Sequence, residues 1–276
     1  MSEQPLSAET PDARDRRITV ALVWGAACHG VFALAGAAMV LAMWFGMSRS
    51  LGPVPPPWSW VANAVLIAQF PLAHSLLLTA RGQRLLARLA PAPYGATLAT
   101  TTYAAVAAAQ LLLLFAFWSP SGVIWWRAEG WALVALTAAY AASWAFLAKA
   151  SFDAGAAVQS GLLGWWALVR GVKPVFPDMP TRGLFRLVRQ PIYLGFALTL
   201  WTVPTWTPDQ LALASLFTAY CALAPLHKER RFARRYGARF AEYRARTPYW
   251  LPLPRRRGVS PPPPPAARSP TPASRA

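Results

Sequence analysis

Charge is scarce in this sequence. Only 13% of its 276 residues are Asp, Glu, Lys or Arg, whereas about a quarter of a typical soluble domain is charged. Only ten residues are acidic, against 27 Lys and Arg, and four of the ten precede Ile18. Hydrophobic residues make up 55% of the chain and gather in long runs with almost no charge. A soluble globular protein is therefore excluded, and the composition predicts an integral membrane protein.

Cysteine and histidine are also rare, with two and three residues. Cys28 and Cys221 lie in separate apolar runs, and neither has a second Cys or a His at the spacing of metal ligands. Cys28 and His29 are adjacent, and adjacent side chains diverge on a helix. We therefore expect no metal site, and we interpret both cysteines as small core residues.

Basic residues outnumber acidic ones, so the net charge is +17 at pH 7. A strongly basic protein can bind nucleic acid, but the sequence has no nucleic-acid recognition motif, and we expect no such partner. In a membrane protein, Lys and Arg mark cytoplasmic loops and attract anionic membrane lipid. The first 17 residues are polar and carry acids as well as arginines, so no cleavable signal peptide is expected.

Six apolar runs predict an all-α fold, a polytopic integral membrane bundle of about six transmembrane helices. The runs cover residues 18–46, 58–80, 97–118, 131–150, 191–203 and 211–226. The fifth run is short. A turn rich in Pro and Thr, residues 204–209, joins it to the sixth.

The distribution of basic residues predicts the orientation of the helices. With the N-terminus in the cytoplasm, the outer loops hold only Arg49 and Arg127, and the turn at 204–209 has no Lys or Arg. All other basic segments then face the cytoplasm. We expect a multi-pass protein of a bacterial-type inner membrane with both termini in the cytoplasm.

The two ends of the chain differ from the membrane domain, which we place at residues 18–250. Residues 1–17 are expected to be disordered. Residues 251–276 contain five consecutive prolines and are expected to form a disordered tail. Aromatic residues at 232, 236, 240 and 243 follow helical spacing and predict an interfacial amphipathic helix. Residues 162–169 are interpreted as a second interfacial piece.

Two polar clusters flank the last two apolar runs. Arg189, Gln190 and Tyr193 stand at the start of the first run, and Glu229 and Arg230 stand at the end of the second. A short connection makes the two helices antiparallel, so these clusters are expected to meet although about 40 positions separate them. This folding would build a site at one face of the membrane.

Each of these residues also has a structural interpretation. Glu229 is then a solvated charge at the membrane edge, Arg189 and Tyr193 mark the same edge, and Pro191 starts a helix. As a site, the start of that helix offers free N–H groups and a positive dipole end, both suited to a carboxylate.

His74 shares a helix face with Asn63 and Phe70, because the three are spaced by 7 and 4. One interpretation is a histidine that faces the bundle and has a hydrogen-bond partner. Another is a pocket group near a substrate, which would help a thiol to ionise. A metal ligand is the third, and neither His29 nor His227 offers a suitable spacing.

The order of these motifs resembles a known superfamily. Residues 189–195 read Arg-Gln-Pro-Ile-Tyr-Leu-Gly, residues 228–229 read Lys-Glu, and residues 236–243 read Tyr-Gly-Ala-Arg-Phe-Ala-Glu-Tyr, with Pro248 beyond. This resembles the isoprenylcysteine carboxyl methyltransferases and phospholipid N-methyltransferases. Their pattern is Arg-His-Pro-x-Tyr-x-Gly, then Glu-Glu, then Phe-Gly-x-x-Tyr-x-x-Tyr. The resemblance is centred on residues 181–250.

Upstream residues resemble one branch of that superfamily. Ala73-His74-Ser75, Phe152-Asp153 and Gln159 are similar to residues of the methanethiol S-methyltransferase branch and its nitric-oxide-reduction-associated relatives. The resemblance implies S-adenosylmethionine as methyl donor and a small lipophilic acceptor, a thiol such as methanethiol. It also allows an isoprenylcysteine- or lipid-directed enzyme, or an accessory protein that keeps the fold without turnover.

The resemblance implies roles for particular residues. The donor-binding candidates are Arg189, Gln190, Pro191, Tyr193, Gly195 and Glu229. The catalytic candidates are His74 and Arg230. Two positions depart from the pattern, because Gln190 replaces the motif His and Lys228 replaces the first Glu. The oligomeric state is not predicted.

Overall fold

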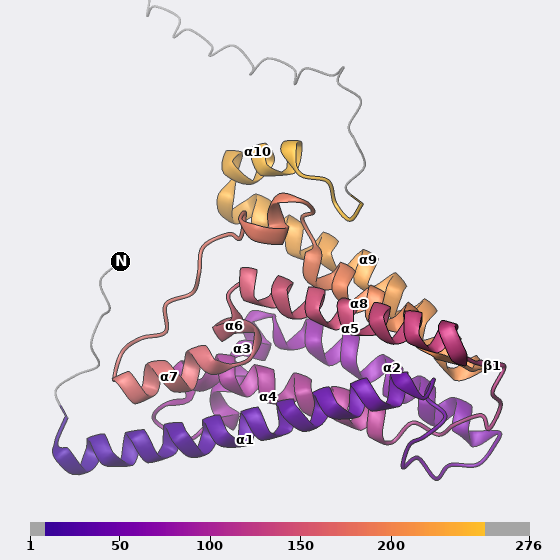
Figure 1. The fold of residues 1–276 in the computed structure, drawn as a ribbon. Helices are drawn as coiled ribbons and strands as arrows, with labels where there is room; N and C mark the ends of the chain where they lie inside the picture. The colour runs from indigo at the N-terminus through magenta and orange to yellow at the C-terminus, as the bar shows by residue number, and fades with distance from the viewer. Residues whose placement is uncertain (1–8, 252–276) are drawn as a thin grey trace, which may run out of the picture.

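The computed structural model describes residues 9–251, whose regular structure is almost entirely helical (Figure 1). The elements are α1 Pro11–Trp44, α2 Trp58–Leu77, α3 Ala80–Leu89, α4 Gly95–Ala116, β1 Trp126–Arg127, α5 Gly130–Asp153, α6 Ala156–Gln159, α7 Leu162–Arg170, the 3-10 helix η1 Gly183–Arg186, α8 Pro191–Trp201, β2 Thr205–Trp206, α9 Pro208–Tyr236 and α10 Ala238–Arg246. Among them, α1, α2, α4, α5 and α9 are long and apolar enough to cross a membrane. The predicted all-α polytopic membrane fold is confirmed.

Helix α8 is shorter than the other apolar helices. It has 11 residues, and a rise of 1.5 Å per residue gives it a length of about 16 Å, roughly half of a hydrocarbon core. Pro191 starts the helix in its first turn, and the chain turns after Trp201 into β2. All six predicted runs are therefore helical, but α8 is too short to cross a membrane by itself.

Helix α1 begins earlier than predicted. The Thr10 side chain accepts a hydrogen bond from the Ala13 amide, Pro11 occupies the first turn, and Asp12 lies near the positive end of the helix. The prediction of disorder over residues 1–17 is therefore wrong for residues 11–17. Residues 1–8 and 252–276, which include the predicted tail except Leu251, lie outside the described residues.

The outer surface of the bundle is apolar, as a lipid-facing surface must be. In the apolar window of α2 only 6% of the residues are buried. Trp60, Val65 and Leu72 of this helix keep 60% or more of their surface exposed. In water these side chains would favour aggregation, whereas acyl chains cover them in a membrane.

A single large core lies toward the end of the molecule where β1 and β2 pair (Figure 1). Met43 of α1, Leu114 of α4, Tyr140 of α5, Val203 after α8 and Leu213 of α9 are all 4% exposed or less and pack together. This core attaches the α8–α9 hairpin to the remaining helices.

Hydrogen bonds from polar side chains join the helices within the bundle. Gln110 Nε2 donates to Gln69 Oε1 at 2.8 Å, and Gln69 Nε2 donates to the Gln110 carbonyl at 2.9 Å. The Asn63 side chain exchanges two hydrogen bonds of 2.8 and 2.9 Å with the Ser119 backbone. Because a polar group left unpaired in lipid costs several kcal/mol, these bonds fix α2 against α4 and the loop that follows it.

Local capping bonds explain the tight turn between α8 and α9. Thr207 caps α9, since its hydroxyl accepts from the Gln210 amide at 2.9 Å. The Gln210 side chain donates to the Leu200 carbonyl of α8 at 2.7 Å. Asp209 accepts from the Trp118 indole at 3.0 Å. The hairpin predicted from the short connection is thus held at its closed end.

The segment predicted to lie along the interface forms α7 and packs on the bundle. The Trp165 amide donates to Thr101 Oγ1 of α4, and the Trp165 indole donates to His29 Nε2 of α1, both at 3.0 Å. At the other end of α7, the Arg17 guanidinium donates to the Leu168 and Val169 carbonyls. A buried cation thus interacts with the negative end of α7.

Candidate active site

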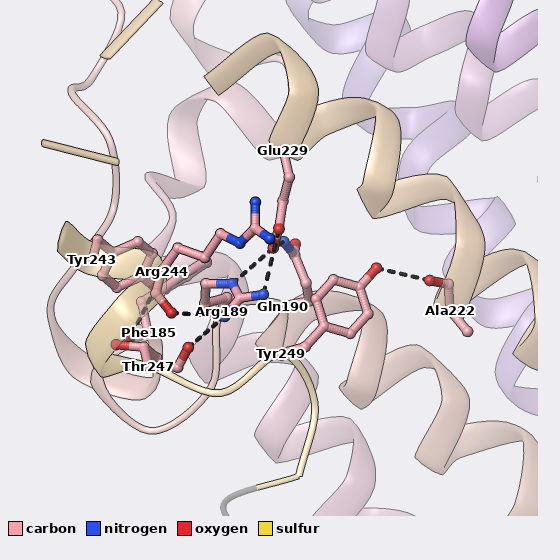
Figure 2. Close-up of polar contacts among 9 residues, drawn as sticks. All are labelled: Phe185, Arg189, Gln190, Ala222, Glu229, Tyr243, Arg244, Thr247 and Tyr249. Atoms are coloured by element: carbon pink, nitrogen blue, oxygen red, sulfur yellow. Dashed lines mark hydrogen bonds and ion pairs between the residues drawn. The ribbon is translucent and has the colours of Figure 1, made fainter. Parts of the chain in front are cut away.

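The start of α8 meets the C-terminal half of α9 through a three-residue polar cluster. Gln190 Nε2 donates to Glu229 Oε1 at 2.9 Å. Arg189 Nε donates to the same oxygen at 2.9 Å, and its Nη2 lies 3.4 Å from Glu229 Oε2. Figure 2 shows both side chains turned toward Glu229. The structure thus brings together three of the six donor-binding candidates from the two sides of the hairpin.

The cluster is largely sealed from solvent. Gln190 is 3% and Glu229 is 9% exposed, and the side chains of Arg189 and Glu229 are 10% and 11% exposed. Gln190 Oε1 is buried and has no hydrogen-bond partner within residues 9–251. A buried acceptor without a partner is uncommon in proteins, so this amide oxygen is available to a ligand.

The chain after α10 folds back over the cluster (Figure 2). Arg189 Nη1 donates to the carbonyls of Thr247 at 2.5 Å and Arg244 at 3.3 Å. The backbone amides of Arg189 and Gln190 donate to the carbonyls of Pro248 and Tyr249 at 2.9 and 3.3 Å. Arg189 therefore caps the end of α10 and joins it to the start of α8.

Two tyrosines hold α10 and the segment after it against the rest of the molecule. The Tyr243 hydroxyl donates to the Phe185 carbonyl, and the Tyr249 hydroxyl donates to the Ala222 carbonyl, both at 2.7 Å. Burial raises the pKa of both phenols to about 12. Both remain protonated donors near neutral pH, so both bonds persist there.

The loop before α8 is held by α5. Asp153 Oδ2 accepts from the Leu184 amide at 2.8 Å, and Asp153 pairs with Lys149 one turn earlier. Gly183 adopts a φ of +59°, and a Cβ there would collide with the Asp153 carboxylate. Glycine is therefore required by both the backbone conformation and the close approach.

A small pocket opens beside the cluster. It is lined by Pro180, Phe185, Arg189, Gln190, Lys228, Phe232, Phe240 and Tyr243. The Lys228 ammonium lies 5.4 to 5.9 Å from the ring centres of Phe185, Tyr193 and Phe232. The pocket therefore combines cations with aromatic faces.

The remaining candidates of this region lie outside the pocket lining. Pro191 starts α8 at its first turn. Gly195 faces α5 instead of the pocket, since a Cβ there would lie 3.0 Å from Leu147 Cα. This close approach gives Gly195 a role in the packing of α8 on α5, and its role in donor binding stays a prediction. Arg230 is exposed, and it forms no hydrogen bond or ion pair to residues 9–251.

His74 belongs to a second cluster of aromatic and polar side chains. The Tyr103 hydroxyl of α4 lies 2.8 Å from His74 Nε2, while His74 Nδ1 is buried and without a partner in the described part of the chain. The Phe70 ring centre lies 5.0 Å from that of His74. The interpretation of His74 as a bundle-facing histidine with a partner agrees with this geometry.

Tyr193 connects the two clusters. Its ring lies near Lys228 on the pocket side, and it interacts electrostatically with Tyr103 on the other. The Arg231 guanidinium is close enough to His74, Tyr103 and Tyr193 for a Coulomb interaction with each. The two clusters are therefore neighbouring parts of one region.

Sequence reasoning missed several residues of this region. Tyr103 is a polar side chain inside an apolar run, and this signal could have singled it out. Tyr243 was assigned to a helix face but not to the site. Tyr249 and Phe185 carry no local signal, because their contacts form only when the chain folds back over the start of α8.

Known methyltransferases are similar in sequence to this chain. The chain is 29% identical over 192 residues to methanethiol S-methyltransferase 2 of Bradyrhizobium diazoefficiens, which covers 70% of the chain and 73% of that protein. It is 29% identical over 197 residues to methanethiol S-methyltransferase of Mycobacterium tuberculosis, covering 71% and 79%. The chain is thus similar over more than two thirds of its length to proteins named as methyltransferases.

The resemblance predicted from the motifs is thereby confirmed. The chain is also 30% identical over 168 residues to Nurim of Rattus norvegicus, covering 58% of the chain and 62% of Nurim. No family model and no solved structure matches the chain. Together with the five long apolar helices, these relatives identify a multi-pass membrane protein.

Proposed function

We propose that the chain is a membrane-embedded S-adenosylmethionine-dependent methyltransferase that methylates a small lipophilic thiol of the methanethiol type. The observation that carries the proposal is the meeting of Arg189, Gln190 and Glu229 beside a pocket, in a chain similar over 70% of its length to a methanethiol S-methyltransferase. Similarity of the motifs alone would not show that these residues lie together.

The residues of the pocket fit the chemical groups of this donor. Aromatic faces such as those of Phe185 and Phe232 attract a cation such as a sulfonium. The unpartnered Gln190 Oε1 offers an acceptor to an ammonium or an adenine amine. Lys228 and Arg189 supply positive charge for a carboxylate. The pocket is much smaller than the roughly 300–1,000 Å³ of a usual ligand site, so we expect α10 to move when a donor enters.

In the proposed mechanism the protein mainly positions and shields the reactants. The donor, when bound, supplies a methyl group on a positively charged sulfur. Glu229 is held in place by Arg189 and Gln190, and α10 with the segment after it excludes water from the pocket. Positioning and water exclusion provide much of the rate enhancement in such reactions.

His74 is proposed to act on the acceptor. Its Nε2 is engaged by Tyr103, which leaves Nδ1 free of partners in residues 9–251. In the tautomer in which Nε2–H donates to the Tyr103 hydroxyl oxygen, Nδ1 keeps its lone pair. It can then take the proton of a thiol, and the thiolate is the stronger nucleophile. Arg230 is left out of the proposed machinery because it is exposed.

We further propose that this end of the bundle faces the cytoplasm of a bacterial-type cell, with both termini on that side. The asymmetry of Lys and Arg between the loops supports this orientation. A soluble donor would then reach the pocket from the cytoplasm, while a lipophilic acceptor would arrive through the membrane.

A second candidate is an accessory protein without turnover. Gln190 and Lys228 stand where the superfamily pattern has His and Glu, and Arg189 is already engaged by Glu229 and two carbonyls.

One experiment tests both candidates. Membranes that carry the chain receive labelled methyl donor and a panel of thiols and lipids, and volatile and lipid products are trapped separately.

The outcomes of this test separate the proposals. Volatile label that depends on an added thiol is the expected result. Label in the lipid fraction would instead assign an isoprenylcysteine- or lipid-directed enzyme. Label in neither fraction would favour the accessory protein. Membranes that carry Arg234→Gln, a change at an exposed position of α9, serve as the positive control.

A further inference from the structure

Lys228 is a cation enclosed by aromatic rings at the wall of the pocket. Its ammonium lies 5.4 Å from the ring centre of Phe232, 5.8 Å from that of Phe185 and 5.9 Å from that of Tyr193. No hydrogen bond or ion pair joins it to residues 9–251. Glu229 attracts it and Arg231 repels it through Coulomb interactions, and neither forms a hydrogen bond or ion pair with it within the described residues. Three N–H donors therefore remain available at the pocket.

Arg189, the other cation of the pocket, is already engaged. Its Nε and Nη2 contact Glu229 at 2.9 and 3.4 Å, and its Nη1 contacts the Thr247 and Arg244 carbonyls at 2.5 and 3.3 Å. A ligand carboxylate could recruit Arg189 only by breaking the bonds that hold α10 in place. Lys228 requires no such exchange.

The surroundings of Lys228 also favour an anionic ligand. An enclosed cation without a hydrogen-bonding partner is unfavourable, and aromatic faces compensate for this only in part. An anion that entered the pocket would supply the missing partner through a charge-assisted hydrogen bond, which is stronger than a neutral one.

We propose that Lys228 is the anion-binding group of the pocket and takes the carboxylate at the amino-acid end of the methyl donor. The assignment rests on the proposed function. It moves this role from Arg189 to Lys228 and leaves Arg189 to hold Glu229 and α10. Lys228 is one of the two positions at which this chain departs from the superfamily pattern, and the proposal makes it a binding residue.

The test uses two ligands that differ by one group. Purified parent protein and Lys228→Gln are titrated calorimetrically with S-adenosylhomocysteine and with its decarboxylated analogue, which keeps the amine. We expect the parent to prefer the carboxylate ligand by about 10- to 100-fold, the usual range for a bond to a charged group. Lys228→Gln should lose this preference and bind the decarboxylated ligand like the parent. Lys228→Arg should keep most of it.

Binding of the decarboxylated ligand also reports that Lys228→Gln has folded, and Arg234→Gln controls for the loss of one positive charge on α9. The proposal is overturned if the parent does not prefer the carboxylate ligand, a result that needs no variant. It is also overturned if Lys228→Gln weakens the binding of both ligands equally, or if it weakens the binding of neither ligand. If the parent binds neither ligand, the proposed function fails as well, and this outcome is distinct from the other two.

Discussion

Gln190 donates to Glu229 across the α8–α9 hairpin at 2.9 Å, and this bond joins two residues 39 positions apart in the chain. Arg189 reinforces it from the adjacent position. The proposed donor site therefore depends on the antiparallel arrangement of α8 and α9, and on the returning segment after α10 that covers it.

Gly183→Ala should destabilise the loop that leads into α8. Gly183 has a φ of +59°, and an added Cβ would collide with the Asp153 carboxylate. Because a non-glycine residue in this conformation costs about 1–3 kcal/mol, the unfolding midpoint in detergent should fall. The matched control is Gly30→Ala in α1, where no atom lies within 4 Å of the new Cβ. Equal midpoints for the two variants would refute the role assigned to Gly183.

Much of this site could be predicted from the sequence. The short turn at 204–209 was enough to bring Arg189 and Gln190 to Glu229, because it permits only an antiparallel pair. The role of Gly195 was not predictable, since helical periodicity does not tell which face of α8 meets α5. The contacts of Arg189 with the Thr247 and Arg244 carbonyls were hidden as well, because backbone acceptors have no sequence signature.

Tyr243→Phe should reduce stability and flatten its dependence on alkaline pH. The lost bond to the Phe185 carbonyl is worth about 1 kcal/mol. Burial raises the pKa of Tyr243 to about 12, whereas an unfolded tyrosine titrates near about 10. The neutral phenol therefore stabilises the fold fully below pH ~10, and this contribution is lost as the pH rises toward ~12.

The measurement is the unfolding midpoint between pH 8 and 12. The parent should lose stability more steeply than Tyr243→Phe above pH ~10. Tyr236→Phe is the control, because the Tyr236 hydroxyl has no hydrogen bond within the described residues. If the unfolding midpoints of the parent and Tyr243→Phe change with pH in parallel, the Tyr243 hydroxyl does not hold α10 in place.

His74→Gln should slow methyl transfer and leave donor binding unchanged. Removing a general base usually lowers the rate by about 10²–10⁴-fold, and His74 lies in the second cluster, where Tyr103 contacts its Nε2. Rates are measured with labelled donor and binding with S-adenosylhomocysteine. His29→Gln is the control, because His29 accepts a hydrogen bond from Trp165 of α7, a residue outside this cluster. An unchanged rate for His74→Gln would leave His74 a structural residue.

Gln190→His tests whether this amide stands in for the motif histidine. The imidazole can keep the hydrogen bond to Glu229, so methyl transfer should be retained or increased. An imidazole titrates near about 6.5, and the Glu229 carboxylate would raise its folded pKa. The charged form then stabilises the fold below about pH 6.5, and this contribution is lost as the pH rises through the raised pKa.

A pH–rate profile of parent and variant between pH 5 and 9 measures this change. We expect a new inflection in Gln190→His that the parent lacks, and loss of transfer in Gln190→Leu. A variant with no activity toward any thiol, alongside an active parent, would show that the pocket no longer accommodates the motif residue.

We propose above that the methyl donor binds at the cluster of Arg189, Gln190 and Glu229. The most direct test of this proposal is a calorimetric titration of purified parent, Glu229→Ala and Arg234→Ala with S-adenosylhomocysteine. Glu229→Ala leaves Arg189 and Gln190 without their shared acceptor, and breaking a buried pair costs about 3–5 kcal/mol, so folding is verified by thermal unfolding. We expect saturable binding by the parent and Arg234→Ala and none by folded Glu229→Ala. No binding by the parent at millimolar ligand, or equal binding by Glu229→Ala, would contradict the proposal.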